Sequence, residues 1–141
     1  MIVECLYNTG AILLHYDRKP LGASVETQYG ELSIGKKYLV MGIIMKSGYL
    51  TYLIDDSGII SACPSYLFRL IDNTIPINWY FKDYTKEDSD YINKEAIWGY
   101  YELIFEDNHY EKLIEFDEEA QRIYFRRKIE LEKIIEEQSS I

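Results

Sequence analysis

Residues 30–72 read GELSIGKKYLVMGIIMKSGYLTYLIDDSGIISACPSYLFRLID, and this stretch decides the fold. It contains three apolar runs, separated by Lys46-Ser47-Gly48 and by Asp55-Asp56-Ser57-Gly58. Turn signals about every ten residues, between runs rich in β-branched and aromatic residues, are typical of an all-β barrel or sandwich. We therefore expect this part of the chain to form a small antiparallel β-barrel.

The first 75 residues divide into five expected strands, which are Ile2–Tyr7, Leu32–Ile44, Tyr49–Ile54, Ile59–Cys63 and Arg69–Ile71. Pro64 ends the fourth strand because it has no N–H to donate, and Ser65–Phe68 is expected to form one helical turn. A long connection, residues 8–31, joins the first two strands. Connections of this length in small domains are usually functional or packed by their own side chains.

Three short motifs in this region follow the order and rough spacing of sequence landmarks in SH3 domains. They are Tyr7 within CLYNT, Glu31-Leu32-Ser33-Ile34 and Pro64-Ser65-Tyr66. Residues 2–72 therefore resemble an SH3-like domain, which implies fold class α+β, with an SH3-like five-stranded antiparallel β-barrel followed by a C-terminal helical appendage. Gly48 and Tyr49 stand where that family carries a tryptophan, so its proline-rich ligand is not carried over. The chain also resembles small bacterial proteins of this type, some of which are thought to be immunity or accessory factors.

We expect residues 1–75 to form the barrel and residues 76–141 to form an aromatic linker and an acidic helical appendage packed on it. The linker residues Trp79, Tyr80 and Phe81 are expected to fill the seam between the two parts, the alternative being an exposed anchor for a partner. Apolar spacing predicts helices over 91–107 and 118–137, with a short helical turn at 109–115. On the last helix Arg127 is expected to pack its stem on the seam with its head in water. The alternative is an arginine that holds a partner carboxylate.

The net charge of −9 is distributed unevenly. Residues 1–75 carry six Lys or Arg and seven Asp or Glu, so this part is nearly neutral. Residues 76–141 carry nine Lys or Arg and seventeen Asp or Glu, so this part is strongly acidic. An acidic surface repels phosphate backbones, so the pattern disfavours nucleic-acid binding, and it would attract a basic protein. The alternative is that these acids are solvated helix faces.

The sequence offers little catalytic chemistry. Cys5 and Cys63 lie in strands without a CxxC motif and are expected to be buried free thiols. Two distant histidines, His15 and His109, do not make a zinc site, and His109 is expected at the surface. We therefore expect no cofactor, no metal and no enzymatic activity. The sequence shows neither a basic secretory leader nor an apolar span of about 20 residues. We therefore expect a cytoplasmic protein without membrane contact.

Long loops on a rigid scaffold carry function more often than strands do. The expected binding surface lies between the long connection and the Pro64 turn, and its candidate residues are His15, Tyr16, Asp17, Tyr29, Tyr66 and Trp79. The favoured interpretation is a non-enzymatic protein-interaction module, for example a toxin-immunity or regulatory accessory protein that docks a basic partner, itself a monomer or weak homodimer. The alternatives are a regulatory module that binds a small ligand or peptide in an aromatic groove, and a hydrolase or transferase whose site is assembled from distant residues.

Overall fold

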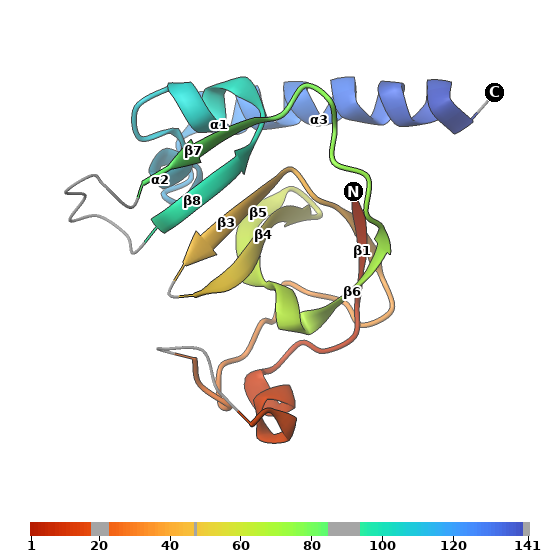
Figure 1. Cartoon of the computed structure of the whole chain (residues 1–141), viewed down its shortest axis with the longest axis vertical. Helices are drawn as coiled ribbons and strands as arrows, with labels where there is room; N and C mark the ends of the chain where they lie inside the picture. The colour runs from red at the N-terminus through yellow and green to blue at the C-terminus, as the bar shows by residue number, and fades with distance from the viewer. Residues whose placement is uncertain (18–22, 47, 85–93, 140–141) are drawn as a thin grey trace.

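The computed structural model describes residues 1–17, 23–46, 48–84 and 94–139 (Figure 1). Its eight strands form two antiparallel sheets. The small sheet has the order β2-β1-β6, from β2 (Lys37–Leu39), β1 (Ile2–Cys5) and β6 (Phe68–Asp72). The large sheet has the order β5-β4-β3-β8-β7, from β5 (Ile59–Pro64), β4 (Tyr49–Asp56), β3 (Gly42–Lys46), β8 (Lys94–Gly99) and β7 (Tyr80–Asp83).

The expected SH3-like closed barrel is wrong: in the described part of the chain both sheets are open. The run 32–44, expected to be one strand, is divided into β2 and β3, and Val40 and Met41 between them carry the chain from the small sheet to the large one. The second edge of β3 is then taken by β8, with Ile44 opposite Ile97. Because β8 and β7 extend the large sheet on that side, the strands do not curl back to close a cylinder. The α+β class remains, without the barrel.

The large sheet lies between two apolar layers. On one face Ile43, Tyr52 and Cys63 pack with residues of the small sheet such as Val3 and Tyr38. On the other face the sheet meets three helices, α1 (Tyr101–Phe105), α2 (His109–Ile114) and α3 (Glu118–Ser139). The side chains of this second core include Ile44, Leu53, Ile97, Leu103, Leu113 and Tyr124. Figure 1 shows α3 along one side of the molecule, next to the large sheet.

The two adjacent acids at the end of β4 tie the large sheet to both of its neighbours. Asp55 Oδ1 accepts hydrogen bonds from Tyr124 Oη at 3.0 Å and Lys128 Nζ at 2.8 Å, both on α3. Asp56, on the opposite face, accepts from Lys36 Nζ at 2.8 Å and from the Tyr38 hydroxyl on β2. The hairpin turn that follows needs only Ser57 and Gly58, which both have positive φ as a two-residue turn requires.

The helix expected over 91–107 is wrong in its described part. Lys94–Gly99 is strand β8, and only Tyr101–Phe105 is helical, while residues 91–93 lie outside the described residues. Ile97 and Ile104 are buried as expected, but they reach the same core from a strand and a helix. Leu103 packs closely over Gly99, where a Cβ would lie 2.4 Å from Leu103 Cδ2.

The last helix is confirmed, with Asp117 Oδ2 accepting from the Ala120 N–H at 3.0 Å as an N-cap. The expected position of the Arg127 head in water is wrong. Its guanidinium binds the carboxylate of Glu102 through Nε and Nη2, at 2.7 and 2.8 Å, and Glu102 is only 6% exposed. Burial raises the pKa of Glu102, but the Arg127 hydrogen bonds and charge outweigh it and hold that pKa below its usual value.

The expected surface position of His109 is also wrong. The ring is 2% exposed, and its Nε2 lies 2.6 Å from the Tyr100 hydroxyl. Both cysteines are buried and free, as expected. In the described chain no helix combines the length and apolar character needed to cross a membrane.

Arg127→Ala should lower the free energy of unfolding by about 3 kcal/mol, because it leaves the buried Glu102 carboxylate without its main partner. The matched control is Arg122→Ala, which removes an exposed pair with Glu119 on the same helix and should cost less than about 0.5 kcal/mol. Urea unfolding at neutral pH measures both. Equal losses in the two variants would contradict the role given to the buried pair.

His109 should make stability depend on pH. Burial lowers its pKa from 6.5 to about 4, against an opposing effect of Glu102, so the unfolded chain binds more protons between these values. The contribution is therefore fully present above pH 6.5 and is lost towards pH 4, by up to about 3 kcal/mol. Urea unfolding across this pH range should show that the free energy of unfolding depends less steeply on pH in His109→Gln than in the original chain. If the unfolding free energy of His109→Gln depended on pH as strongly as that of the original chain, the assignment would be refuted.

Candidate functional site

The long connection is folded back on itself around a short 3-10 helix, η1 (Gly10–His15). The Gly10 N–H donates to the Thr27 carbonyl at 2.8 Å, and the Tyr29 N–H donates to the Asn8 carbonyl at 2.9 Å. Glycine is needed at position 10, because a Cβ would lie 1.9 Å from the Ser24 carbonyl oxygen. Leu13 of η1 is fully buried. The described residues near the two ends of the connection are thus held together by main-chain hydrogen bonds.

Four tyrosines meet where this connection reaches the second 3-10 turn, η2 (Ser65–Leu67), and we call Tyr16, Tyr29, Tyr49 and Tyr66 the tyrosine cluster. The Tyr66 ring lies 6.1 Å from Tyr16, edge to face, and 6.2 Å from Tyr49, centroid to centroid. Its hydroxyl is 3.4 Å from that of Tyr29. Burial, and then the Tyr66 hydrogen bond, raise the pKa of Tyr29. The cluster therefore offers aromatic faces together with neutral hydroxyl groups.

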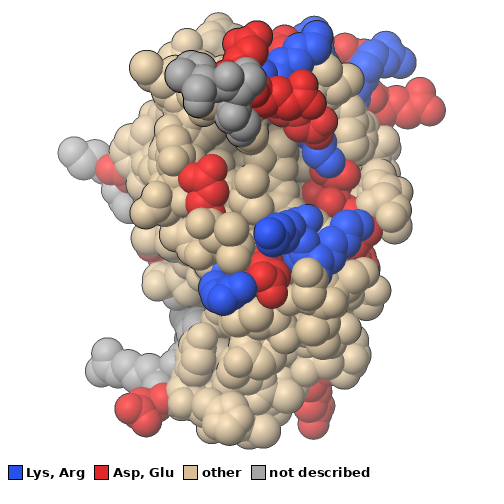
Figure 2. All heavy atoms as spheres, turned by 90° about the vertical axis from the view of Figure 1, so that its right-hand side faces the viewer, with Lys and Arg blue, Asp and Glu red and all other residues tan. Residues whose placement is uncertain are grey.

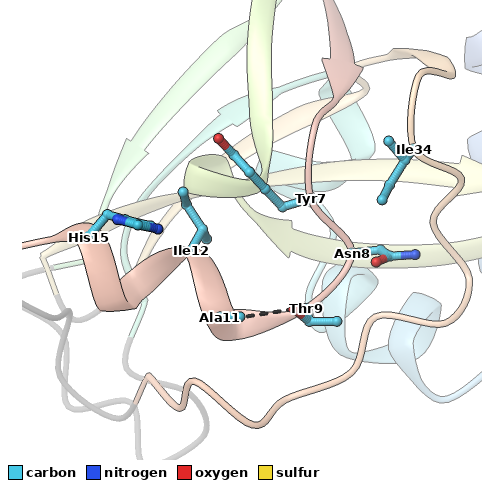
Figure 3. A pocket seen from close by; sticks show the side chains of 7 residues that line it. All are labelled: Tyr7, Asn8, Thr9, Ala11, Ile12, His15 and Ile34. Carbon is cyan, nitrogen blue, oxygen red and sulfur yellow. Dashed lines mark hydrogen bonds between the residues drawn. The ribbon is translucent and has the colours of Figure 1, made fainter.

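A hollow of about 290 Å³ lies on another side of η1, and we call it the η1 hollow (Figure 3). Ile12 and His15 come from η1, Tyr7 from the segment between β1 and η1, and Ile34 from the chain that leads to β2. The remaining lining residues are Asn8, Thr9 and Ala11. The hollow suits an apolar group with a polar rim, because its Ile and Tyr side chains are flanked by Asn8, Thr9 and His15.

Charged side chains are sparse around this region. In Figure 2 they gather over the upper and middle parts of the face, where positive and negative groups alternate. The lower part of this face is mostly tan, with acidic side chains at its margins. Ile34, which lines the η1 hollow, and Leu14 of η1 are exposed by 63% and 68%. Exposed apolar side chains together with tyrosines are the composition expected of a binding patch.

The structure brings together part of the predicted site. Tyr16 and Tyr29 both contact Tyr66 in the tyrosine cluster, and His15 lines the η1 hollow. Asp17 is exposed next to Tyr16 in the chain. Trp79, in contrast, precedes β7 and is partly buried against the core beside the small sheet, and no ring contact joins it to the cluster within the described residues.

Sequence reasoning missed two groups of residues. Tyr49 completes the cluster from the start of β4, although it was considered only as a replacement for a tryptophan. A second group is formed by Tyr80, Tyr101 and Phe105, whose ring centroids lie 4.9–5.9 Å apart. All three are about half exposed, at the edge strand β7 and on α1. Helical spacing predicted burial of Tyr101 and Phe105, and Tyr80 was expected to fill the seam, with an exposed anchor as the alternative.

The thiols near the site are poorly suited to nucleophilic chemistry. Burial raises the pKa of Cys63 to about 12, against the hydrogen bond from Ser61, and burial also raises the pKa of Cys5. Both thiols are therefore protonated near neutral pH. Across residues 1–17, 23–46, 48–84 and 94–139, no group of three or more His, Cys, Asp and Glu side chains is arranged to hold a metal ion.

Comparison of the chain with protein-family models, with curated proteins and with solved structures found no match in any of the three. What the protein does is therefore inferred from its own side chains and their arrangement.

Proposed function

We propose that the protein is a non-enzymatic interaction module that binds a basic protein partner. The observation that carries this proposal is the tyrosine cluster beside the η1 hollow, held on an anchored backbone. Tyrosine gives a large contact area at low cost in side-chain entropy, and it is enriched where proteins bind each other. A fixed backbone reduces the ordering cost of association.

Charge supports a basic partner. Within the acidic half, Glu102 and Glu111 are already paired with Arg127 and Lys94 inside the protein. The acids Glu106, Asp107, Glu115, Asp117 and Glu118 are exposed around the ends of the helices. They leave a negative field that would steer a positively charged protein to the surface. A cytoplasmic toxin-immunity or regulatory accessory protein would use this combination of steering charge and aromatic contact to mask a basic enzyme.

The second candidate is a regulatory module that binds a small molecule or a peptide. The η1 hollow favours it, because its mainly apolar wall carries a few polar groups, Asn8, Thr9 and His15, which could fix the orientation of a ligand. A small ligand in the hollow would raise the melting temperature, and the shift would vanish in Tyr66→Ala only if the tyrosine cluster contributes to binding.

Affinity capture from the native host tests the main proposal. At low salt the immobilised chain should retain a basic protein, and capture should fall strongly between about 0.05 and 0.5 M salt, because screening weakens the steering charges. Tyr66→Ala should weaken the affinity about tenfold or more, the loss expected of an interface hot spot. Ile129→Ala, at an exposed residue of α3, is the control for a surface change outside the site.

Thermal melting of both variants should first establish that they remain folded. Capture of no basic protein, or equal capture by Tyr66→Ala and the original chain, would refute the proposal.

A further inference from the structure

Strand β5 is an edge of the large sheet. Among the described residues it pairs with β4 alone, in a register that runs from Asp56 opposite Ile59 to Thr51 opposite Pro64. Edge strands are usually protected by charges, bulges or proline, since their outer N–H and C=O groups can pair with another chain. The sequence of β5, IISACP, has no charged residue, and its proline stands at the last position.

A hollow of about 420 Å³ runs beside this edge, between β5 and the end of α2. We call it the β5 groove. Its apolar lining residues include Ile59 and Ala62 from the strand, and Ile114 and Phe116 from the end of α2. Ile59 and Phe116 are 51% and 61% exposed. An extended segment laid along β5 would therefore find main-chain partners on one side and apolar contacts on the other.

Phe116 is held in a backbone conformation that phenylalanine rarely adopts. Its φ is +63°, in the left-handed region. The Asp117 N–H donates to the Lys112 carbonyl at 2.9 Å and the Phe116 N–H to the Leu113 carbonyl at 3.2 Å. This is the Schellman pattern, in which the position of Phe116 is usually glycine. An exposed aromatic side chain at a strained position adds little to folding, so it points to a role at the surface.

The charges around the β5 groove favour a basic occupant. Glu31 lines the groove, and Glu115, Asp117 and Glu118 are exposed on either side of Phe116. Lys46, which also lines it, donates to the Tyr110 hydroxyl at 2.6 Å. A second copy of this chain, with net charge −9, would bring its own acids against these. Charge complementarity therefore selects a basic segment over self-association.

We infer that an extended basic segment of a partner protein adds to β5 as a further strand, with an apolar side chain seated between Ile59 and Phe116. This inference rests on the proposed function and specifies how the partner is bound. The groove and the proposed site are linked along the chain, since β5 leads directly into η2 and Tyr66, and Glu31 Oε1 lies 3.8 Å from Cys63 Sγ on β5. Main-chain pairing supplies affinity in this mode, and side-chain pockets supply specificity.

The test uses a synthetic peptide of alternating lysine and isoleucine with blocked ends, titrated into the full chain. Its binding should weaken with salt, and it should slow hydrogen exchange of the β5 amides. Two forms of the peptide, N-methylated on the odd or on the even amides, separate main-chain pairing from general attraction. Because an extended peptide pairs with a neighbouring strand through every second amide, the form methylated on the pairing amides should bind at least tenfold more weakly. A peptide with glutamate in place of lysine should not bind.

Phe116→Gly separates the surface role of this residue from a structural one. The change relieves the positive φ, so the melting temperature should rise by a few degrees, while peptide affinity should fall about tenfold. Asn108→Gly is the matched control, because Asn108 also has a positive φ, of 62°, at the start of α2 and does not line the groove. It should leave peptide affinity unchanged.

The inference is overturned if the peptide does not bind, if both methylated forms bind as well as the parent, or if Phe116→Gly binds it equally well. Sedimentation that shows a dimer abolished by Phe116→Gly would also overturn it, in favour of a second copy as occupant. Failure here is distinguishable from failure of the proposed function. A captured basic protein that is lost in Tyr66→Ala but retained in Phe116→Gly leaves the interaction module intact and removes only strand addition.

Discussion

Burial of the large sheet on both faces is the constraint on which the rest of the structure depends. Gly42, Ile43 and Ile44 on β3, and residues 51–54 on β4, are buried at every successive position. Since successive side chains of a strand point to opposite faces, each face requires its own apolar cover. The small sheet covers one face and the helices cover the other. Asp55 and Asp56 then fix the two layers by hydrogen bonds in opposite directions.

This constraint explains which parts of the fold could be predicted from sequence. Local signals placed β1, β4, β5, η2 and the last helix correctly, because each depends on nearby turn, proline or capping residues. Closure of a barrel depends instead on which strand takes the free edge of β3. That strand is β8, whose Ile97 was assigned to a helix because Ile97, Tyr100 and Ile104 also have helical spacing. Periodicity over so few residues cannot separate a strand followed by a helical turn from one helix.

Part of the candidate site could also be predicted from the sequence. Tyr16, Tyr29 and Tyr66 lie in the segments expected to face each other, so their meeting follows from connectivity. Trp79 was included because tryptophan is common at interfaces, but its position is set by the route from β6 to β7, which has no local signal. Phe116 could not be found from sequence, because a left-handed residue after a helix is normally indicated by glycine or asparagine.

Burial and internal partners separate the residues that serve folding from those available for binding. Glu102, Glu111 and Asp55 are acids used inside the protein, where removal of a partner would leave a buried charge. Phe116 and Tyr66 make the opposite case: Phe116 occupies a costly backbone conformation, and Tyr66 belongs to a cluster that is only partly buried. Folding alone would favour glycine at position 116, so the exposed phenylalanine there supports the inferred contact with a partner.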